Sequence, residues 1–143
     1  MSGRPAGAPA APAAQILIVD DDIMLLDLLQ LQLSGRAVQV RVAEDAVIAL
    51  RSIIESPPDL ILLDLGLPYL DGVEVLKALK GDPSTQHIPV IVITGNDDES
   101  EHTRVRMLGA QAVLRKPVNS EDLINEIFSR LTRSVASRGL AAR

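Results

Sequence analysis

The sequence Ile16-Leu17-Ile18-Val19-Asp20-Asp21-Asp22 joins a short apolar run to three consecutive acids. A continuous apolar run of this length is typical of a strand covered on both faces of a parallel sheet. Three carboxylates at the end of such a strand repel one another, so they require a compensating positive charge. A divalent cation such as Mg²⁺ prefers carboxylate oxygens and retains several of its waters. This stretch therefore predicts a buried strand that ends at a metal site.

The same arrangement recurs where Leu60-Ile61-Leu62-Leu63 leads directly into Asp64. Similar apolar runs predict strands at 15–19, 37–42, 59–63, 89–93 and 112–115. The segments between them predict helices at 23–34, 45–55, 72–80, 98–108 and 120–132. Five strands that alternate with five helices indicate an α/β fold, in which helices cover both faces of a parallel sheet.

Composition limits the organisation and the function of the chain. Its 143 residues suffice for one domain, which we expect at 15–132, between a disordered Ala/Pro arm at 1–14 and a flexible tail or truncated linker at 133–143. The net charge is −5 and no basic run is present, which argues against direct nucleic acid binding. Cysteine is absent, which excludes disulfides and zinc–thiolate sites. No apolar stretch is long enough to span a membrane, so we expect a cytoplasmic protein.

Polar side chains follow four of the predicted strands at the point where each strand ends. Asp20 to Asp22 follow the first strand, Asp64 the third, Thr94 the fourth and Lys116 the fifth. Ligands of an open parallel sheet bind outside the carboxyl ends of its strands, so these groups should meet at one edge. The set suits phosphoryl transfer: Asp64 as nucleophile, a metal on the acids, and Lys116 and Thr94 on the phosphoryl oxygens. Simple helix capping by Asp20 to Asp22 is the alternative reading of those acids alone.

These segments resemble the response-regulator receiver domains of two-component signalling. The resemblance rests on Ile16-Leu17-Ile18-Val19-Asp20-Asp21-Asp22, Leu62-Leu63-Asp64-Leu65-Gly66-Leu67-Pro68-Tyr69-Leu70-Asp71-Gly72, Pro89-Val90-Ile91-Val92-Ile93-Thr94-Gly95, Leu108-Gly109-Ala110 and Lys116-Pro117. It implies a flavodoxin-like, doubly wound fold with strand order 2-1-3-4-5.

The resemblance also assigns roles to individual residues. Asp64 would accept a phosphoryl group from a phosphohistidine of a sensor histidine kinase or a histidine phosphotransfer protein. Mg²⁺ or Mn²⁺ would be held by Asp20, Asp21, Asp64 and the backbone carbonyl of Gly66. Thr94 would be the switch hydroxyl and Lys116 the lysine that contacts the phosphoryl group. The protein would then be a regulatory phosphoacceptor rather than an enzyme.

The chain departs from the usual pattern of the family at Val113, where many relatives have an aromatic residue that moves on activation. Gly66 and Asn96 occupy the two positions that tune the lifetime of the acyl phosphate in the family. We expect the face around 96–118 to contact an output partner or domain. An aspartate-nucleophile phosphatase and a degenerate, phosphorylation-independent binding module are the alternative functions.

Two smaller expectations concern residues outside this set. His87 and His102 have no spacing typical of metal ligands and are expected to be solvated. Asn96 and Glu99 have the spacing of a capping box at the start of a helix.

Overall fold

The computed structural model describes residues 13–66 and 71–141, with side chains through Leu131. Most of the predicted arm at 1–14 and the stretch Leu67 to Leu70 of the family motif lie outside these residues. Among the described residues, no helix is long and apolar enough to cross a membrane.

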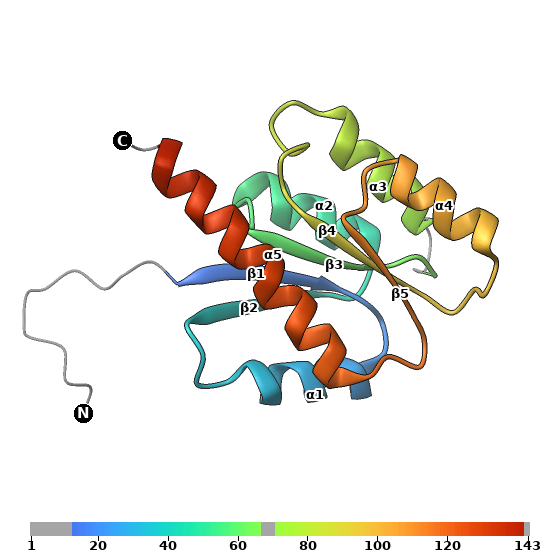
Figure 1. The fold of residues 1–143 in the computed structure, drawn as a ribbon, viewed down its shortest axis with the longest axis horizontal. Helices are drawn as coiled ribbons and strands as arrows, with labels where there is room; N and C mark the ends of the chain where they lie inside the picture. The colour runs from blue at the N-terminus through green and yellow to red at the C-terminus, as the bar shows by residue number, and fades with distance from the viewer. Residues whose placement is uncertain (1–12, 67–70, 142–143) are drawn as a thin grey trace, which may run out of the picture.

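Five parallel strands form one sheet in the order β2-β1-β3-β4-β5, as the resemblance implied (Figure 1). The strands are β1 (Ala14–Val19), β2 (Val38–Ala43), β3 (Leu60–Asp64), β4 (Val90–Thr94) and β5 (Ala112–Arg115). The helices are α1 (Ile23–Leu33), α2 (Ala46–Glu55), α3 (Gly72–Gly81), α4 (Glu99–Met107) and α5 (Ser120–Ala141). The predicted α/β, doubly wound architecture is therefore confirmed.

The sheet separates two apolar layers because successive side chains of a strand point to opposite faces. On β1, Ile16 and Ile18 pack with α1 and α5, whereas Leu17 and Val19 pack with α2, α3 and α4. The three central strands β1, β3 and β4 are almost fully buried along their length. Each buried Leu, Ile or Val contributes about 1.5–3 kcal/mol, so these two layers stabilise the sheet whose edge carries the polar residues.

Both ends of α1 carry residues suited to end a helix. Asp22 caps α1 by accepting hydrogen bonds from the backbone N–H groups of Met24 and Leu25, at 3.1 and 3.3 Å. Gly35 follows α1 with φ of +82°, a conformation in which glycine carries no steric cost.

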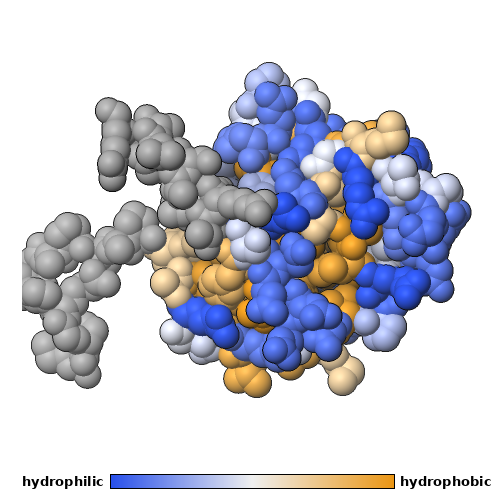
Figure 2. Space-filling view, viewed as in Figure 1, coloured by the Kyte–Doolittle hydropathy of each residue, from blue (hydrophilic) through white to orange (hydrophobic). Residues whose placement is uncertain are grey.

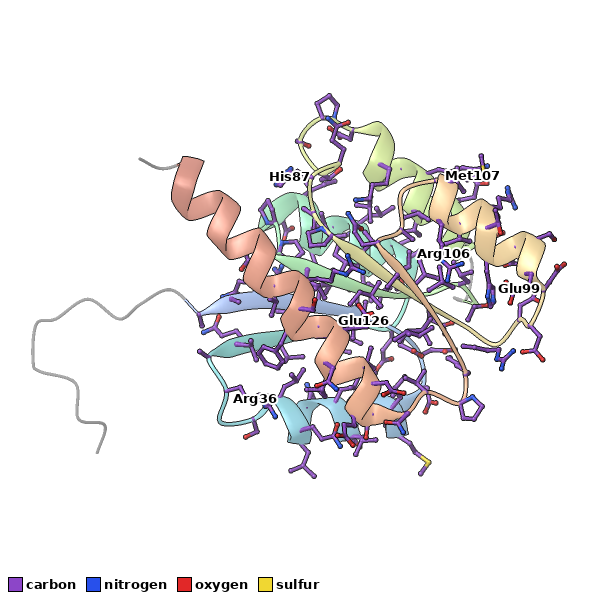
Figure 3. The ribbon with its side chains drawn as sticks, in the orientation of Figure 1. Arg36, His87, Glu99, Arg106, Met107 and Glu126 are labelled. Atoms are coloured by element: carbon purple, nitrogen blue, oxygen red, sulfur yellow. The ribbon has the colours of Figure 1, made fainter. Side chains whose placement is uncertain are left out.

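The last helix is longer than the sequence predicted. We expected it to end at 132 and a flexible tail to follow, but α5 continues to Ala141. Residues 133–138 contain neither proline nor glycine, and their alanine and arginine favour helix, whereas Gly139 comes only two residues before the observed end of α5. At its centre α5 contacts Arg36, whose guanidinium carbon lies 4.9 Å from the centroid of the Phe128 ring (Figure 3).

Candidate functional site

Three strand ends are built with the same local hydrogen bond. The side chains of Asp20, Asp64 and Thr94 each accept a hydrogen bond from the backbone N–H two residues further on, at 2.9, 3.0 and 3.1 Å. These turns hold all three side-chain oxygens at the carboxyl edge of the sheet. The neighbouring strands β1, β3 and β4 therefore deliver their polar groups to one place, as the sequence predicted.

Three carboxylates meet at this edge. One oxygen from each of Asp20, Asp21 and Asp64 lies within 4.8 Å of the others. Asp20 is only 1% exposed and Asp64 only 6%, whereas Asp21 is exposed to solvent. The Oδ2 atom of Asp20 is buried and accepts no hydrogen bond from any group in the described part of the chain.

Lys116 faces two of these acids from the end of β5. Its Nζ lies 3.2 Å from Asp64 Oδ2, to which it donates a hydrogen bond, and 3.7 Å from Asp20 Oδ2. Its backbone N–H donates to the carbonyl of Thr94 at 2.8 Å, and the Lys116–Pro117 peptide bond is cis. Burial by itself would lower the pKa of Lys116, but the charges of Asp20 and Asp64 outweigh it and raise that pKa above its usual value.

The acid cluster carries more negative charge than one lysine neutralises. Burial raises the pKa of Asp20 to about 6, the N–H of Asp22 opposes this, and the charge of Asp64 adds to it. A buried carboxylate that is this costly to ionise, with one oxygen lacking a hydrogen bond, is a fitting ligand for a cation. An all-oxygen set suits Mg²⁺ or Mn²⁺.

The site opens into a cavity of about 450 Å³. Its lining comprises Asp21, Asp64, Leu65, Gly66, Asp71, Thr94, Gly95, Asn96, Glu101 and Lys116. Gly66 and Gly95 present no side chain, so Asp64 and Thr94 remain accessible from the cavity. Asp71 and Glu101 were not predicted as site residues. Asp71 belongs to the family motif that also contains Asp64, whereas Glu101 gave no signal beyond its place among the acids of α4.

Gly72 holds the backbone of the site in position through its lack of a side chain. A Cβ atom at this position would lie 2.5 Å from Leu65 Cα and 2.7 Å from the Asp64 carbonyl oxygen. The N–H of Gly72 donates to the Leu65 carbonyl at 3.0 Å, so the approach is fixed by a hydrogen bond. The start of α3 therefore packs directly against the backbone segment that carries Asp64.

Replacing Gly72 with alanine should lower the free energy of unfolding by about 3 kcal/mol, because backbone atoms cannot yield as a flexible side chain can. Gly81 of the same helix is the matched control, since a Cβ there meets nothing within 4 Å. Gly81→Ala should leave stability unchanged or raise it by up to about 1 kcal/mol. Urea denaturation of both variants measures the difference, and equal midpoints for the two would contradict the close approach.

Two expectations about the β4–α4 segment are wrong. His102 is buried, not solvated, and its Nε2 lies 2.6 Å from the carbonyl oxygen of Asn96. Asp98, not Asn96, caps α4 by accepting a hydrogen bond from the Ser100 N–H, because Asn96 lies further back in the loop. His87 is exposed, as predicted.

Fold and site together define a class: a doubly wound α/β domain with an acid cluster, a hydroxyl and a lysine at the carboxyl edge of its sheet. The family model of the response regulator receiver domain matches residues 16–128. The chain belongs to the response regulator receiver domain family.

Known proteins agree with this assignment. The chain is 38% identical over 121 residues to response regulator PleD of Caulobacter vibrioides, a match that covers 85% of this chain and 26% of PleD. The crystal structure of a CheY-like receiver domain protein from Methanospirillum hungatei superposes with a TM-score of 0.79 at 30% identity, covering 87% of this chain and 98% of that one. The Mn²⁺-bound form of response regulator Rcp1 gives 0.70 at 31% identity, covering 80% and 88%. The chain thus spans about a quarter of PleD.

Proposed function

We propose that Asp64 is the phosphoacceptor of this receiver domain and that it takes its phosphoryl group from a phosphohistidine. The observation that carries the proposal is the position of its carboxylate. Asp64 lines the cavity, belongs to the acid cluster and lies 3.2 Å from the Lys116 ammonium. A nucleophile beside a fixed positive charge suits transfer of a phosphoryl group.

In the transfer, an oxygen of Asp64 forms a bond to phosphorus as the bond from phosphorus to the histidine nitrogen breaks. The phosphohistidine ring carries a proton on its other nitrogen, so the imidazole that keeps the electron pair of the broken bond leaves as a neutral ring. Lys116 then contacts a phosphoryl oxygen, and the Thr94 hydroxyl, whose oxygen already accepts from Asn96, is free to donate its proton to another. The chain thus contributes positioning and charge compensation.

The metal site is proposed on the same cluster. Asp20, Asp21, Asp64 and the carbonyl of Gly66 would hold Mg²⁺ or Mn²⁺. When bound, the ion supplies positive charge to the phosphoryl oxygens. The cluster of oxygens within 4.8 Å and the buried Oδ2 of Asp20 support this assignment, and the related Rcp1 is described as Mn²⁺-bound.

Of the alternatives, a phosphatase with an aspartate nucleophile is not favoured. Such enzymes commonly need an acid/base carboxylate two residues after the nucleophile, where this chain has Gly66. The only covalent chemistry we propose is phosphorylation and dephosphorylation of the chain itself, in the cytoplasm. The face around 96–118 would transmit the result to an output partner or domain.

The phosphodonor needs a docking surface beside the site, and we assign it to the exposed side of α1. Ile23, Met24, Leu28 and Leu31 form an apolar α1 patch, in which Met24 is 83% exposed and Leu31 74%. Orange atoms along the lower edge of Figure 2 coincide with the position of α1 in Figure 1. The patch begins directly after Asp20 to Asp22, so a donor bound there would be close to the cavity.

Met24→Asp should slow phosphotransfer from a phosphorylated histidine phosphotransfer domain by about tenfold, because a charge replaces an apolar contact. The same variant should react normally with phosphoramidate, which needs no docking surface. Met107→Asp is the matched control, since Met107 is equally exposed on α4 (Figure 3). The assignment of the α1 patch would be refuted if Met24→Asp slowed the reaction with phosphoramidate as much as the reaction with the phosphotransfer domain. It would also be refuted if Met107→Asp slowed phosphotransfer as much as Met24→Asp does.

The direct test of the proposed function is incubation of the chain with phosphoramidate and Mg²⁺, followed by intact mass measurement. We expect the mass of one phosphoryl group to be added, and hydroxylamine to remove it, because an acyl phosphate is labile to that nucleophile. Omission of Mg²⁺ in the presence of EDTA should suppress the reaction. An unchanged mass, with metal binding demonstrated separately, would reject the function.

A further inference from the structure

Asn96 connects the switch hydroxyl to the first turns of α4 through four hydrogen bonds. Its backbone N–H donates to Thr94 Oγ1 at 3.1 Å. Its side-chain oxygen accepts from the N–H of Asp98 at 2.8 Å, and its side-chain Nδ2 donates to Glu101 Oε2. Its carbonyl accepts a hydrogen bond from Nε2 of His102 at 2.6 Å, because a carbonyl oxygen can only accept.

The chain has Val113 at the position where many relatives have an aromatic residue. Val113 is half-buried against the core layer of α2, α3 and α4, and its side chain has no group that could hydrogen-bond to Thr94. A polar route from Thr94 to α4 does exist, and it passes through Asn96 to Glu101 and His102. Both partners belong to α4, so a displacement of Asn96 acts on that helix.

Glu101 also shares the cavity with the phosphoacceptor. Its carboxylate is part of the same lining as Asp64, Thr94 and Asn96. A phosphoryl group on Asp64 would bring further negative charge and strong acceptor oxygens into this space. The charge would repel Glu101, and the oxygens would compete with it for the amide of Asn96.

We propose that Glu101 and His102 are positioning residues that anchor Asn96 to α4, and that phosphorylation releases the Glu101 anchor. In the unphosphorylated chain both residues hold Asn96, and through it the Thr94 hydroxyl, in the observed place. In the phosphorylated chain Glu101 separates from Asn96 and the start of α4 loosens. The inference rests on the proposed function, because it requires a phosphoryl group on Asp64.

Coupling of this kind is reciprocal. If phosphorylation weakens the bond between Asn96 and Glu101, then removal of that bond must favour phosphorylation. We expect the equilibrium constant for phosphoryl transfer from a phosphorylated histidine phosphotransfer domain to rise by about fivefold when Glu101 cannot hold Asn96, which corresponds to a coupling at the lower end of the usual range.

The test compares Glu101→Ala, which removes both bond and charge, with Glu101→Gln, which keeps an acceptor and removes only the charge. Hydrogen exchange of the α4 amides is measured by mass spectrometry with and without phosphoramidate and Mg²⁺. In the wild type, exchange at 99–102 should rise on phosphorylation. In Glu101→Ala it should already be high, and in Glu101→Gln it should start low and rise less than in the wild type.

Glu99→Ala is the matched control, because Glu99 is an exposed acid in the same first turn of α4 (Figure 3) and is not part of the cavity lining. It should behave as the wild type in both measurements. His102→Gln keeps an N–H donor near the Asn96 carbonyl and should preserve the low basal exchange.

Two results separate failure of this inference from failure of the proposed function. Suppose that the wild type is phosphorylated, but that the α4 amides of Glu101→Ala and Glu101→Gln exchange hydrogen at the same rates as in the wild type. The bond between Glu101 and Asn96 then has no role and the inference is wrong. If the wild type gains no phosphoryl group, the phosphoacceptor assignment fails first. If Glu99→Ala and Glu101→Ala change exchange and phosphorylation equally, the cause is the total negative charge of α4, and the inference is also wrong.

Discussion

The Asp64→Asn variant should gain no mass from phosphoramidate and Mg²⁺ under conditions in which the wild type gains one phosphoryl group. The substitution is almost isosteric, and its side-chain oxygen can still accept the hydrogen bond that Gly66 N–H now donates to Asp64 at 3.0 Å. The fold should therefore persist while the nucleophile is lost, since an amide oxygen is a far weaker nucleophile than a carboxylate oxygen.

Other acids lie near Asp64, but each is held in a different way. Asp20 is almost fully buried and does not belong to the described lining of the cavity. Asp71 does line it, but its Oδ1 caps α3 by accepting from the Val73 N–H at 2.9 Å. Asp64 alone among the acids of the described lining forms a close ion pair with Lys116.

Asp71→Asn is the matched control for this prediction. Asparagine can retain the cap of α3, and the variant removes one negative charge from the same cavity. It should still be phosphorylated at Asp64. Peptide mapping after reduction of the acyl phosphate with borohydride identifies the modified residue, and modification of any acid other than Asp64 in the wild type would refute the assignment.

Most of the fold could be predicted from the sequence because its strands are short continuous apolar runs with marked ends. The run from Leu60 to Leu63 is buried throughout, and Asp64 follows it at the edge of the sheet. The strand ends of a parallel sheet lie together, so acids about forty residues apart could be expected at one site. The three turns at Asp20, Asp64 and Thr94 are the local structure that realises this expectation.

The contacts of α4 could not be predicted in the same way. Its first turns contain several polar residues in succession. Which of them is buried depends on which face of the helix packs against the sheet. Val105 is fully buried, and the same rotation buries His102 and brings Glu101 to the cavity. The only core residue in this part of α4 is a single valine, so the pattern of apolar residues is too sparse to fix that rotation.

The second large effect is expected at Asp20. In the absence of divalent metal at pH 7, Asp20→Asn should raise the free energy of unfolding by roughly 2 kcal/mol. The wild-type carboxylate is buried beside Asp64, and burial raises its pKa to about 6. Ionised Asp20 is therefore costly in the folded chain, whereas asparagine is neutral and can still accept the hydrogen bond from Asp22 N–H.

The pH dependence follows from the direction of that pKa shift. Between the unfolded pKa of about 4 and the folded pKa of about 6, the folded chain binds more protons at Asp20 than the unfolded chain does. The Asp20 contribution to the free energy of unfolding should therefore decrease as the pH rises through this window. Urea denaturation in EDTA from pH 4 to pH 7 should reveal this decrease as a difference between the wild type and Asp20→Asn.

Mg²⁺ should reverse the order of stability at pH 7, because a bound cation turns the costly carboxylate into a ligand. At a concentration one hundred times its dissociation constant, Mg²⁺ should stabilise the wild type by about 2.7 kcal/mol and Asp20→Asn by much less. Asp22→Asn is the control, since Asp22 is exposed and caps α1, a role that asparagine fills equally well. If Asp20→Asn were destabilising in EDTA, or were stabilised by Mg²⁺ as strongly as the wild type, Asp20 could not be the buried, strained carboxylate of a metal site.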